Sequence, residues 1–439
     1  MVEFLPLNGI RYNSRKISDL SAVVAPPYDV IAPAEQENYY ARHPHNVIRL
    51  ILGRTEPGDD ERNNAPARAA VHLDNWLREA ILIQEPEPAF YLTATTFNHE
   101  GRRFTRTGII GRVKLRPFEE GDILPHECTF SKVKTEQLRL MQACRANLSP
   151  VFGLCADCGG LFSEIQKLMR EQPPAINFTD DHQLHHGVWF LTDPRHTASL
   201  SASLRGHRIY IADGHHRYET ALNYRDYLSQ RNPALPANHP ANYVLISLSG
   251  IEDPGMIVLP AHRLLKDVPG DRMRSFISRS HAFFEVVPFG SGGGGIEALA
   301  QAKALQKEFA AQNAITAIVR PHDEIFVLRL KPGVMKERYP DEPESLRSLD
   351  VTVLTRLVLM ELLGYDQANL DDENRIFYRT DALECLHSVR QGSADMAFIM
   401  NPTRIDQVRR VSEEGLIMPR KSTYFFPKVI SGLVINPLW

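Results

Sequence analysis

The chain has 439 residues, which is enough for two or three domains and a substantial hydrophobic core. Hydrophobic residues make up 43% of the chain and charged residues 23%, a composition that argues against long disordered regions. The formal net charge of −3, from 50 basic and 53 acidic residues, excludes a broad field that would attract nucleic acid or a membrane surface. Any anion-binding site must therefore be local.

Targeting and cysteine signals favour a cytoplasmic protein without membrane association. No apolar run approaches the roughly 18 to 20 residues of a transmembrane helix, and Met1 to Pro6 contain no basic region followed by an apolar one. The five cysteines are an odd number, unlike a secreted disulfide framework. Cys155 and Cys158 form a Cys-x-x-Cys pair with no second pair at zinc spacing, so a metal or redox role and two plain thiols both stay open.

Residues 1–104 combine rigid turns with mixed secondary structure. The segment 26–29, Pro-Pro-Tyr-Asp, fixes an extended, turning loop between two apolar runs. Residues 62–80 space apolar side chains at a helical period, whereas 90–92 and 107–115 are typical of strands. We expect this N-terminal region to pack on the core that follows it.

Residues 105–270 have the pattern of one compact α/β unit. A helix is predicted over 132–147. The segment 207–212 has strand composition, Gly214 turns the chain, and apolar residues from Tyr218 to Leu228 then recur at helical intervals. The other strands predicted here are 150–154, 188–191, 243–248 and 256–259.

Residues 271–439 are expected to form a C-terminal α/β or α+β domain. The glycine-rich stretch 290–295 lacks the Gly-Lys-Ser/Thr ending of a P-loop, which favours a flexible loop over a phosphate site. An Ala-rich helix is predicted over 296–312. Strands are predicted at 317–319 and 325–328, and helices at 348–363 and 404–414.

The junction between the strand at 207–212 and the helix after it has the composition of an anion site. The first N–H groups of a helix point at one place and carry the positive end of the helix dipole, and Gly214 lets a ligand approach the backbone. Arg217 is expected to clamp phosphate oxygens, with His215 and His216 as further donors and Asp213 as helix N-cap, metal ligand or base. The alternative is that Asp213 only caps the helix and the histidines are surface or core residues. The five residues together favour phosphate.

Two segments resemble a known superfamily. Ala212 to Ala221 (ADGHHRYETA) and Leu124 to Glu127 (LPHE) resemble the paired motifs of the ParB/sulfiredoxin-like superfamily, especially its free serine kinases. The resemblance implies a ParB/sulfiredoxin-like core, a phosphate-binding turn at Asp213 to Arg217, and an acidic residue beside the substrate hydroxyl at Glu127. Sulfiredoxins carry a catalytic cysteine in this turn, where this chain has a histidine, which argues against sulfinic acid reduction.

Nearly the whole chain also resembles a bacterial and archaeal family known only as a conserved domain of unknown function. The segments that carry this resemblance are 24–31 (VAPPYDVI), 46–50 (NVIRL), the two motifs above, and 418–428 (MPRKSTYFFPK). The free serine kinase layout differs, because Glu127 and Asp213 lie about 85 residues apart here and long N- and C-terminal additions are present.

Further side chains are expected around this turn. Glu127 is the expected base for a hydroxyl, and His126 either orients it, touches phosphate, or is only a turn residue. Asp29 could bind Mg²⁺ or a substrate ammonium group, or form an Asx turn, and Arg49 could hold a substrate carboxylate or make a structural ion pair. Lys132 could face the donor phosphates or lie on a solvated helix face. The polar C-terminal cluster Lys421, Ser422, Thr423 and Lys428 could close over phosphates, and His262 and Arg263 could line the site.

These residues lead to one main hypothesis and two rivals. The main hypothesis is a phosphotransferase that phosphorylates the hydroxyl of free L-serine or a similar small metabolite, using ATP, ADP or pyrophosphate with Mg²⁺. The motif indicates transfer, and the resemblance implies serine. The rivals are a ParB-like regulatory protein that binds DNA under nucleotide control and a hydrolase that acts on a phosphodiester through His215 or His216. The expected partners are the small-molecule substrate and the phosphoryl donor, without nucleic acid.

Overall fold

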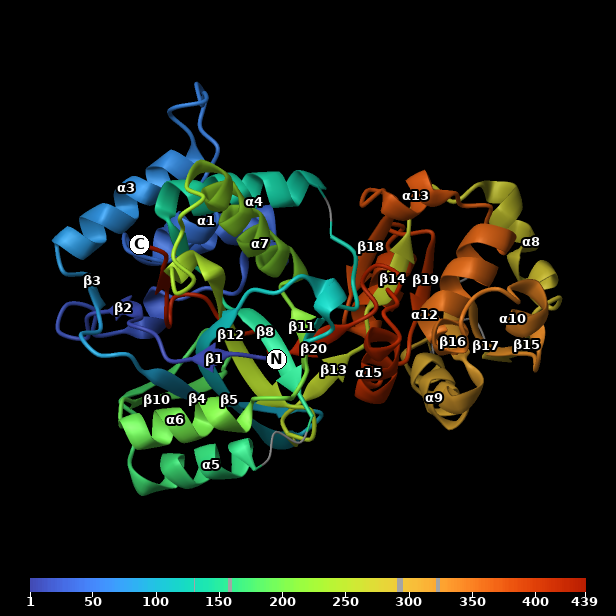
Figure 1. The fold of residues 1–439 in the computed structure, drawn as a ribbon. Coiled ribbons are helices and arrows are strands. Elements are labelled where there is room, and N and C mark those ends of the chain that lie inside the picture. The colour runs from blue at the N-terminus through green and yellow to red at the C-terminus, as the bar shows by residue number, and fades with distance from the viewer. Residues whose placement is uncertain (130, 157–159, 290–294, 321–323) are drawn as a thin grey trace. The chain divides into compact units, whose positions relative to one another are not determined.

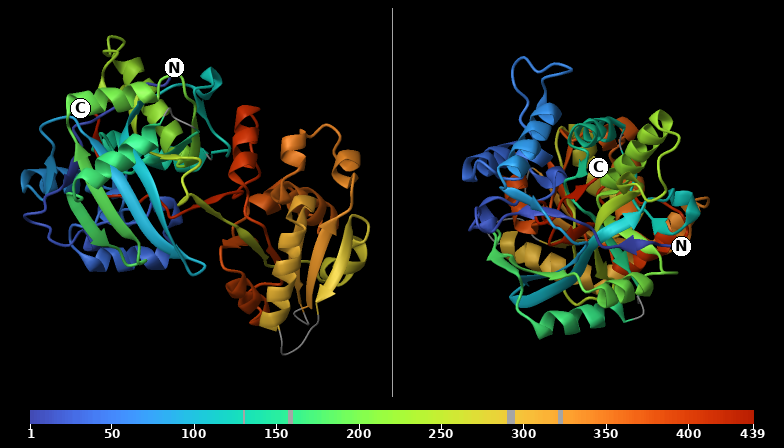
Figure 2. Two further views of the ribbon diagram at one scale, coloured as in Figure 1. Left: turned by 90° about the horizontal axis from the view of Figure 1, so that it is seen from below. Right: turned by 60° about the vertical axis from the view of Figure 1, so that its left-hand side comes forward.

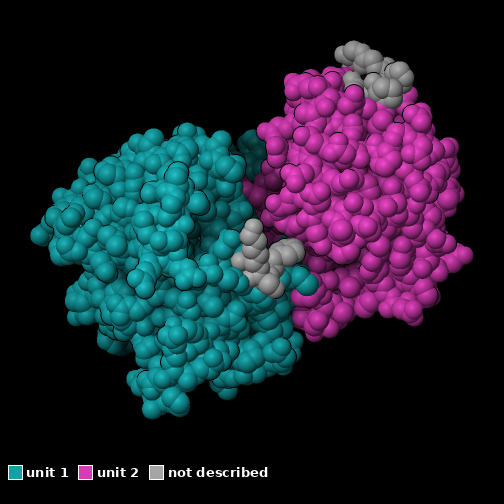
Figure 3. Space-filling view, turned by 90° about the horizontal axis from the view of Figure 1, so that it is seen from above, with its two compact units in different colours: residues 1–257, 427–439 teal, residues 258–426 magenta. Residues whose placement is uncertain are grey.

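The computed structural model describes residues 1–129, 131–156, 160–289, 295–320 and 324–439, except the side chains of Ser131 and Lys132. The expected roles of Cys158, the Lys132 side chain and residues 290–294 therefore concern parts outside the described residues. Two compact units divide the chain: residues 1–257 with 427–439, and residues 258–426 (Figure 3). The C-terminal end lies among elements of the first unit, as Figure 1 and Figure 2 show.

This division differs from the three regions expected from the sequence. Strand β5 (Arg102–Lys114) runs across residue 104, where we expected a boundary, and pairs with β4 (Phe90–His99) along its length. The first unit thus contains both the N-terminal region and most of the expected core. The second unit begins at residue 258 and ends at residue 426, and the last thirteen residues, 427–439, belong to the first unit.

The first unit is built on a mixed sheet, which has nine strands within the described residues. Two pairs are parallel (β11 with β6, β12 with β8) and the other pairs along the path are antiparallel; β1 (Phe4–Leu5) pairs with the C-terminal end of β5. The mixed α/β class expected from the sequence is confirmed. The path runs β6 (Ile123–Leu124), β11 (Ile209–Asp213), β8 (Val151–Cys155), β12 (Tyr243–Gly250), β5, β4, β10 (His185–Leu191) and β9 (Ile176–Thr179).

Helices cover this sheet because their apolar residues recur at helical spacing and must leave water. Figure 1 shows α5 and α6 lying side by side, and α3, α4 and α7 pack successively on one another. Tyr218, Ala221 and Tyr224 of α7 share a core with Ile209 and Ile211 of β11. The helices of this unit are α1 (Pro33–Arg42), α2 (Ile48–Ile51), α3 (Ala65–Arg78), α4 (Ser131–Cys144), α5 (Leu161–Glu171), α6 (Pro194–Ser203) and α7 (His215–Arg231).

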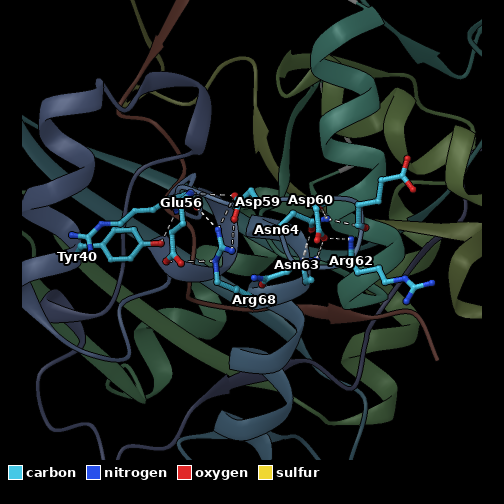
Figure 4. A network of polar contacts seen from close by, with 11 residues as sticks. Tyr40, Glu56, Asp59, Asp60, Arg62, Asn63, Asn64 and Arg68 are labelled. Carbon is cyan, nitrogen blue, oxygen red and sulfur yellow. Dashed lines mark hydrogen bonds and ion pairs between the residues drawn. The ribbon is translucent and has the colours of Figure 1, made fainter.

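The loop before α3 is held by polar contacts (Figure 4). Asn64 caps α3 by accepting a hydrogen bond from the backbone N–H of Ala67 over 3.0 Å. Arg68 reaches back from the first turns of the helix and binds Asp59 through both terminal nitrogens, at 2.6 and 3.0 Å. This cap explains why the helix predicted over 62–80 begins at Ala65.

The second unit has an antiparallel sheet covered by α9 (Gly295–Glu308) and α14 (Ala382–Arg390). Its strand order is β15 (Phe284–Phe289), β17 (Glu324–Leu330), β16 (Ala314–Val319), β19 (Met396–Ile399), β14 (His262–Leu265) and β18 (Ile376–Arg379). A separate ladder pairs β13 (Ile257–Leu259) with β20 (Tyr424–Phe426). The other helices of the described residues are α8 (Gly270–Ser280), α10 (Val334–Arg338), α11 (Glu344–Arg347), α12 (Asp350–Val353) with the π-helical segment Leu354–Leu362, α13 (Gln367–Asp371) and α15 (Ile405–Glu413).

No helix among the described residues is both long and apolar enough to cross a lipid bilayer.

Candidate functional site

Strand β11 passes into helix α7 through a single glycine. Gly214 has φ +86°, a left-handed conformation that residues with a Cβ rarely adopt. Helix α7 has 17 residues, and no side chain in the described part of the chain caps its N-terminus. An uncapped helix start of this length presents backbone N–H groups and the positive end of the helix dipole, which is the geometry of an anion site.

Asp213 is the last residue of β11 and serves neither as cap nor as a free carboxylate. Its Oδ1 accepts a hydrogen bond from Nζ of Lys428 over 2.6 Å, and its Oδ2 accepts one from Arg217. Burial opposes ionisation of Asp213, but the charges of Lys428 and Arg217 outweigh it and hold the pKa of this carboxyl well below its usual value. With both oxygens bound to cations, Asp213 braces the turn and is a poor base or metal ligand.

The side chain of Arg217 points into the protein, whereas we expected it to point outward and bind phosphate oxygens. The residue is 7% exposed, and its guanidinium donates to the backbone oxygen of Pro150 and to Asp213. Gly214 makes this fold possible, because a Cβ there would lie 2.8 Å from both Cζ and Nε of Arg217. Burial lowers the pKa of Arg217, but Asp29 and Asp213 together raise it above its usual value. The residue stabilises the turn from inside.

His215 connects the helix start to the upstream motif. Its Nε2 accepts a hydrogen bond from the backbone N–H of His126 over 3.3 Å, so the proton of a neutral ring sits on Nδ1. Nδ1 faces Oε2 of Glu127 at 3.9 Å. Burial and the neighbouring imidazole of His126 hold the pKa of His215 well below its usual value, which keeps the ring neutral. The two rings meet edge to face with centroids 4.7 Å apart.

The loop that carries Glu127 is tied to α7 one turn further along the helix. Oε2 of Glu219 accepts hydrogen bonds from Oγ1 of Thr129 and from Nζ of Lys134, each over 2.6 Å. The side chain of Glu127 is 29% exposed, in contrast to the nearly buried His215. The two sequence motifs, at 124–127 and 212–221, therefore meet in the structure, and the side chain of Glu127 is the more exposed of the facing pair.

Of the two N-terminal residues that we expected at the site, Asp29 lies near the turn and Arg49 makes structural contacts elsewhere. Asp29 lies with its Oδ2 3.6 Å from a terminal nitrogen of Arg217, so the rigid Pro-Pro-Tyr-Asp loop does reach the turn. The terminal nitrogens of Arg49 donate to the backbone oxygens of His43 and Tyr40, each over 3.0 Å, and its guanidinium lies over the Tyr40 ring. These contacts give Arg49 a structural role in the α1–α2 corner.

The remaining expected residues belong to the second unit and are mostly buried within it. Nδ1 of His262 accepts a hydrogen bond from the backbone N–H of Met400, and burial lowers the pKa of His262 to about 3. Arg263, 4% exposed, donates to the backbone oxygens of Ala261 and Lys421. Ser422 and Thr423 are buried as well. Lys428 is separate from this group, because residues 427–439 belong to the first unit.

One residue near the turn was missed by sequence reasoning. Arg106 of β5 is 5% exposed and donates to the backbone oxygen of Pro427 over 2.6 Å, directly before Lys428. Burial lowers the pKa of Arg106 to about 10. A signal was present: Arg106 falls on the same face of its strand as Gly108 and Ile110, a position where a charged residue is costly without a partner.

Comparison with known proteins gives a family match and only distant structural likenesses. Residues 4–352 match the model of the family described as "Protein of unknown function (DUF1015)". No curated protein matches the chain. A free serine kinase in complex with AMP has 12% identity and a TM-score of 0.33, over 70% of this chain and 84% of that one.

Two other solved structures are similar at the same level. A conserved hypothetical protein from Pyrococcus furiosus has 14% identity and a TM-score of 0.35, over 73% of this chain and 94% of that one. SbnI with a C-terminal truncation, from Staphylococcus aureus, has 12% identity and a TM-score of 0.33, over 74% and 87%. Scores at this level carry no argument about function, which must come from the site.

Proposed function

The chain belongs to the DUF1015 family of proteins of unknown function, and from its site we propose that it is a phosphotransferase acting on the hydroxyl of a small metabolite. One observation carries the proposal. The carboxylate of Glu127 lies 3.9 Å from Nδ1 of His215, the first residue of the uncapped helix α7. The proposed base for a hydroxyl thus adjoins the proposed binding site for phosphate, which is the pairing that phosphoryl transfer needs.

In the proposed reaction the N-terminus of α7 binds the donor phosphates, and Glu127 takes the proton of the acceptor hydroxyl. The hydroxyl oxygen forms the new P–O bond while the bond from the phosphoryl group to the leaving phosphate or nucleotide breaks. His215 acts through Glu127 as a positioning residue, because the proton-bearing Nδ1 of its neutral ring faces the carboxylate at 3.9 Å. His216, the second residue of α7, adds a side chain at the same helix start.

Mg²⁺ would neutralise charge on the transferred phosphoryl group. Groups of three or more histidine, cysteine or acidic residues that could hold a metal are absent among the described residues. That fits Mg²⁺, which binds through one or two carboxylates together with substrate phosphates. We assign Asp29 to it rather than Asp213, because both oxygens of Asp213 are bound to Lys428 and Arg217.

We propose free L-serine or a similar hydroxyl compound as the acceptor, and ATP, ADP or pyrophosphate as the donor. The paired motifs support serine through their resemblance to free serine kinases, and the geometry supports only a hydroxyl and a phosphate.

A donor-by-acceptor screen with purified protein tests the proposal. ATP, ADP and pyrophosphate are each incubated with Mg²⁺ and L-serine, L-threonine, L-homoserine or glycerol, and phosphorylated products are identified by mass spectrometry. We expect a phosphorylated acceptor with at least one pair. Cleavage of bis(p-nitrophenyl) phosphate without transfer would instead support the phosphodiesterase, and nucleotide-dependent DNA retention that falls with salt would support the ParB-like regulator.

A further inference from the structure

One face of the central sheet carries a polar patch where an apolar core would be expected. Side chains alternate along a strand, so Thr93 and Thr95 of β4 share a face, as do Arg106 and Gly108 of β5. The register places Thr95 opposite Arg106 and Thr93 opposite Gly108. A Cβ at Gly108 would lie 2.9 Å from Oγ1 of Thr93 and 3.2 Å from Oγ of Ser249 in β12. The absence of a Cβ at Gly108 therefore leaves room for the hydroxyls of Thr93 and Ser249, which lie over this glycine.

Beside these hydroxyls lies a pocket whose lining includes residues of the C-terminal segment from Lys428 to Leu433. Its polar lining consists of Thr93, Thr95, Arg106, His186, Ser247, Ser249 and Lys428. His186 is held by Asp180, whose Oδ2 lies 2.9 Å from its Nε2, and its Nδ1 lies 3.4 Å from Oγ1 of Thr95. The carboxylate of Asp180 thus contacts His186 and is not part of the pocket lining.

Arg106 is a buried cation without an ion-pair partner among the described residues. Its one hydrogen bond there runs from Nη1 to the backbone oxygen of Pro427, and its guanidinium lies 4.7 Å from the centroid of the Phe152 ring. The nearby carboxylate of Asp253 is occupied by the backbone N–H groups of Thr107 and Gly255. An unpaired buried charge is costly, and an anion in the pocket would remove that cost.

We propose that this pocket binds the carboxylate of the acceptor, an inference that rests on the proposed function and names its substrate class: hydroxyl compounds that also carry a carboxylate. The remaining donors of Arg106 and the hydroxyls of Thr93, Ser247 and Ser249 would hold the two carboxylate oxygens. Lys428 links this pocket to the turn, because this residue is part of the pocket lining and its ammonium group donates to Asp213.

The size of the pocket favours a carboxylate over a donor nucleotide. The pocket volume is about 20 Å³, room for one or two water-sized groups and too little for a nucleotide. A planar guanidinium with flanking hydroxyls matches the two oxygens of a carboxylate and the oxygens of a phosphate alike, so the small volume decides between them. In the proposed reaction the donor phosphates bind elsewhere, at the N-terminus of α7.

Isothermal titration with L-serine, ethanolamine and pyrophosphate tests the inference on the full chain. Ethanolamine has the hydroxyl and ammonium groups of serine but lacks the carboxylate. We expect wild-type protein to bind L-serine at least tenfold more tightly than ethanolamine.

In Arg106→Gln this preference should fall below threefold, with the Kd for pyrophosphate unchanged within twofold. Ser249→Ala keeps the buried charge and should reduce the preference several-fold if Arg106→Gln does not fold. Arg103→Gln, at an exposed position of the same strand, is the matched control and should leave all three values unchanged.

The outcomes separate this inference from the proposed function. If the carboxylate preference depends on Arg106 but no donor gives a phosphorylated product, the pocket is supported and phosphoryl transfer is not. If transfer occurs while the preference is the same in wild type and in both variants, the inference is wrong. If Arg106→Gln weakens pyrophosphate rather than L-serine, the pocket holds donor phosphate, which also overturns the assignment. A wild type that binds neither serine nor ethanolamine contradicts the inference and the serine assignment together.

Discussion

The backbone N–H of His126 donates to Nε2 of His215, and this bond decides which nitrogen of His215 faces Glu127. A neutral imidazole has one donor and one acceptor nitrogen, so accepting on Nε2 leaves a proton on Nδ1. The paired motifs thus meet through a backbone contact, and Glu127 gains a directed N–H. The proton-bearing nitrogen of His215 therefore faces the carboxylate that we propose as the base.

The pH dependence of stability should reflect His126. Burial lowers its pKa to about 4 from the ordinary 6.5, so the unfolded chain binds a proton that the folded protein does not. Stability from this residue is present above pH 6.5 and is lost as the pH falls toward 4, by up to about 3 kcal/mol. Denaturant unfolding at pH 7 and pH 4.5 should show a larger loss for wild type than for His126→Gln. Equal losses would contradict a buried neutral His126.

Gly214 should be more sensitive to substitution than another glycine with the same backbone conformation. Gly214 and Gly206 have φ +86° and +84°, but only at Gly214 would an added Cβ lie within 3 Å of the Arg217 side chain. Gly206→Ala should cost about 1 kcal/mol through backbone strain alone. Gly214→Ala should cost at least twice as much and weaken pyrophosphate binding, because it displaces the guanidinium. Equal costs in thermal unfolding would show that Arg217 does not depend on the glycine.

Lys428 should stabilise the turn through Asp213. The two side chains are 13% and 16% exposed, so the pair is only weakly screened by water. Lys428→Met leaves Asp213 with Arg217 alone and should lower the unfolding free energy by about 2 kcal/mol. Lys167→Met, at an exposed position of α5, is the matched control and should change it by less than about 0.5 kcal/mol. A loss no larger than that of the control would mean that Asp213 is held by Arg217 alone.

Arg49 should affect stability rather than substrate binding. Its terminal nitrogens hold two backbone oxygens, so Arg49→Met should lower the unfolding free energy by about 2 kcal/mol. The KM for the acceptor should stay within twofold of wild type. A tenfold rise in that KM with unchanged stability would instead support the carboxylate-binding role that the sequence suggested.

Local patterns predicted much of the fold. The strand–glycine–helix junction is confirmed as β11, Gly214 and α7, because periodicity and the glycine are both local signals. The helix expected over 348–363 is confirmed as α12 continued by π-helical turns. The orientation of Arg217 was not predictable, since it depends on Pro150 and Asp29, both distant in sequence.

The C-terminal motif shows a second limit of sequence reasoning. Lys421, Ser422, Thr423 and Lys428 look like one cluster in the sequence, but the unit boundary falls between Phe426 and Pro427. Lys428 then binds Asp213, while Ser422 is buried in the other unit. Chain proximity could not reveal this division, because it is set by which sheet each side of the segment joins.

The most direct test of the account compares Glu127→Gln with wild type in single-turnover transfer to L-serine. The donor Kd is measured in the same preparations, and Glu119→Gln, at an exposed position of the 3-10 helix Phe118–Glu120 before β6, is the matched control. We predict that Glu127→Gln lowers the rate of phosphoserine formation at least 100-fold, with the donor Kd within twofold of wild type and Glu119→Gln at the wild-type rate. Transfer by Glu127→Gln at the wild-type rate, or no phosphorylated product from wild type with any donor that it binds, would contradict the account.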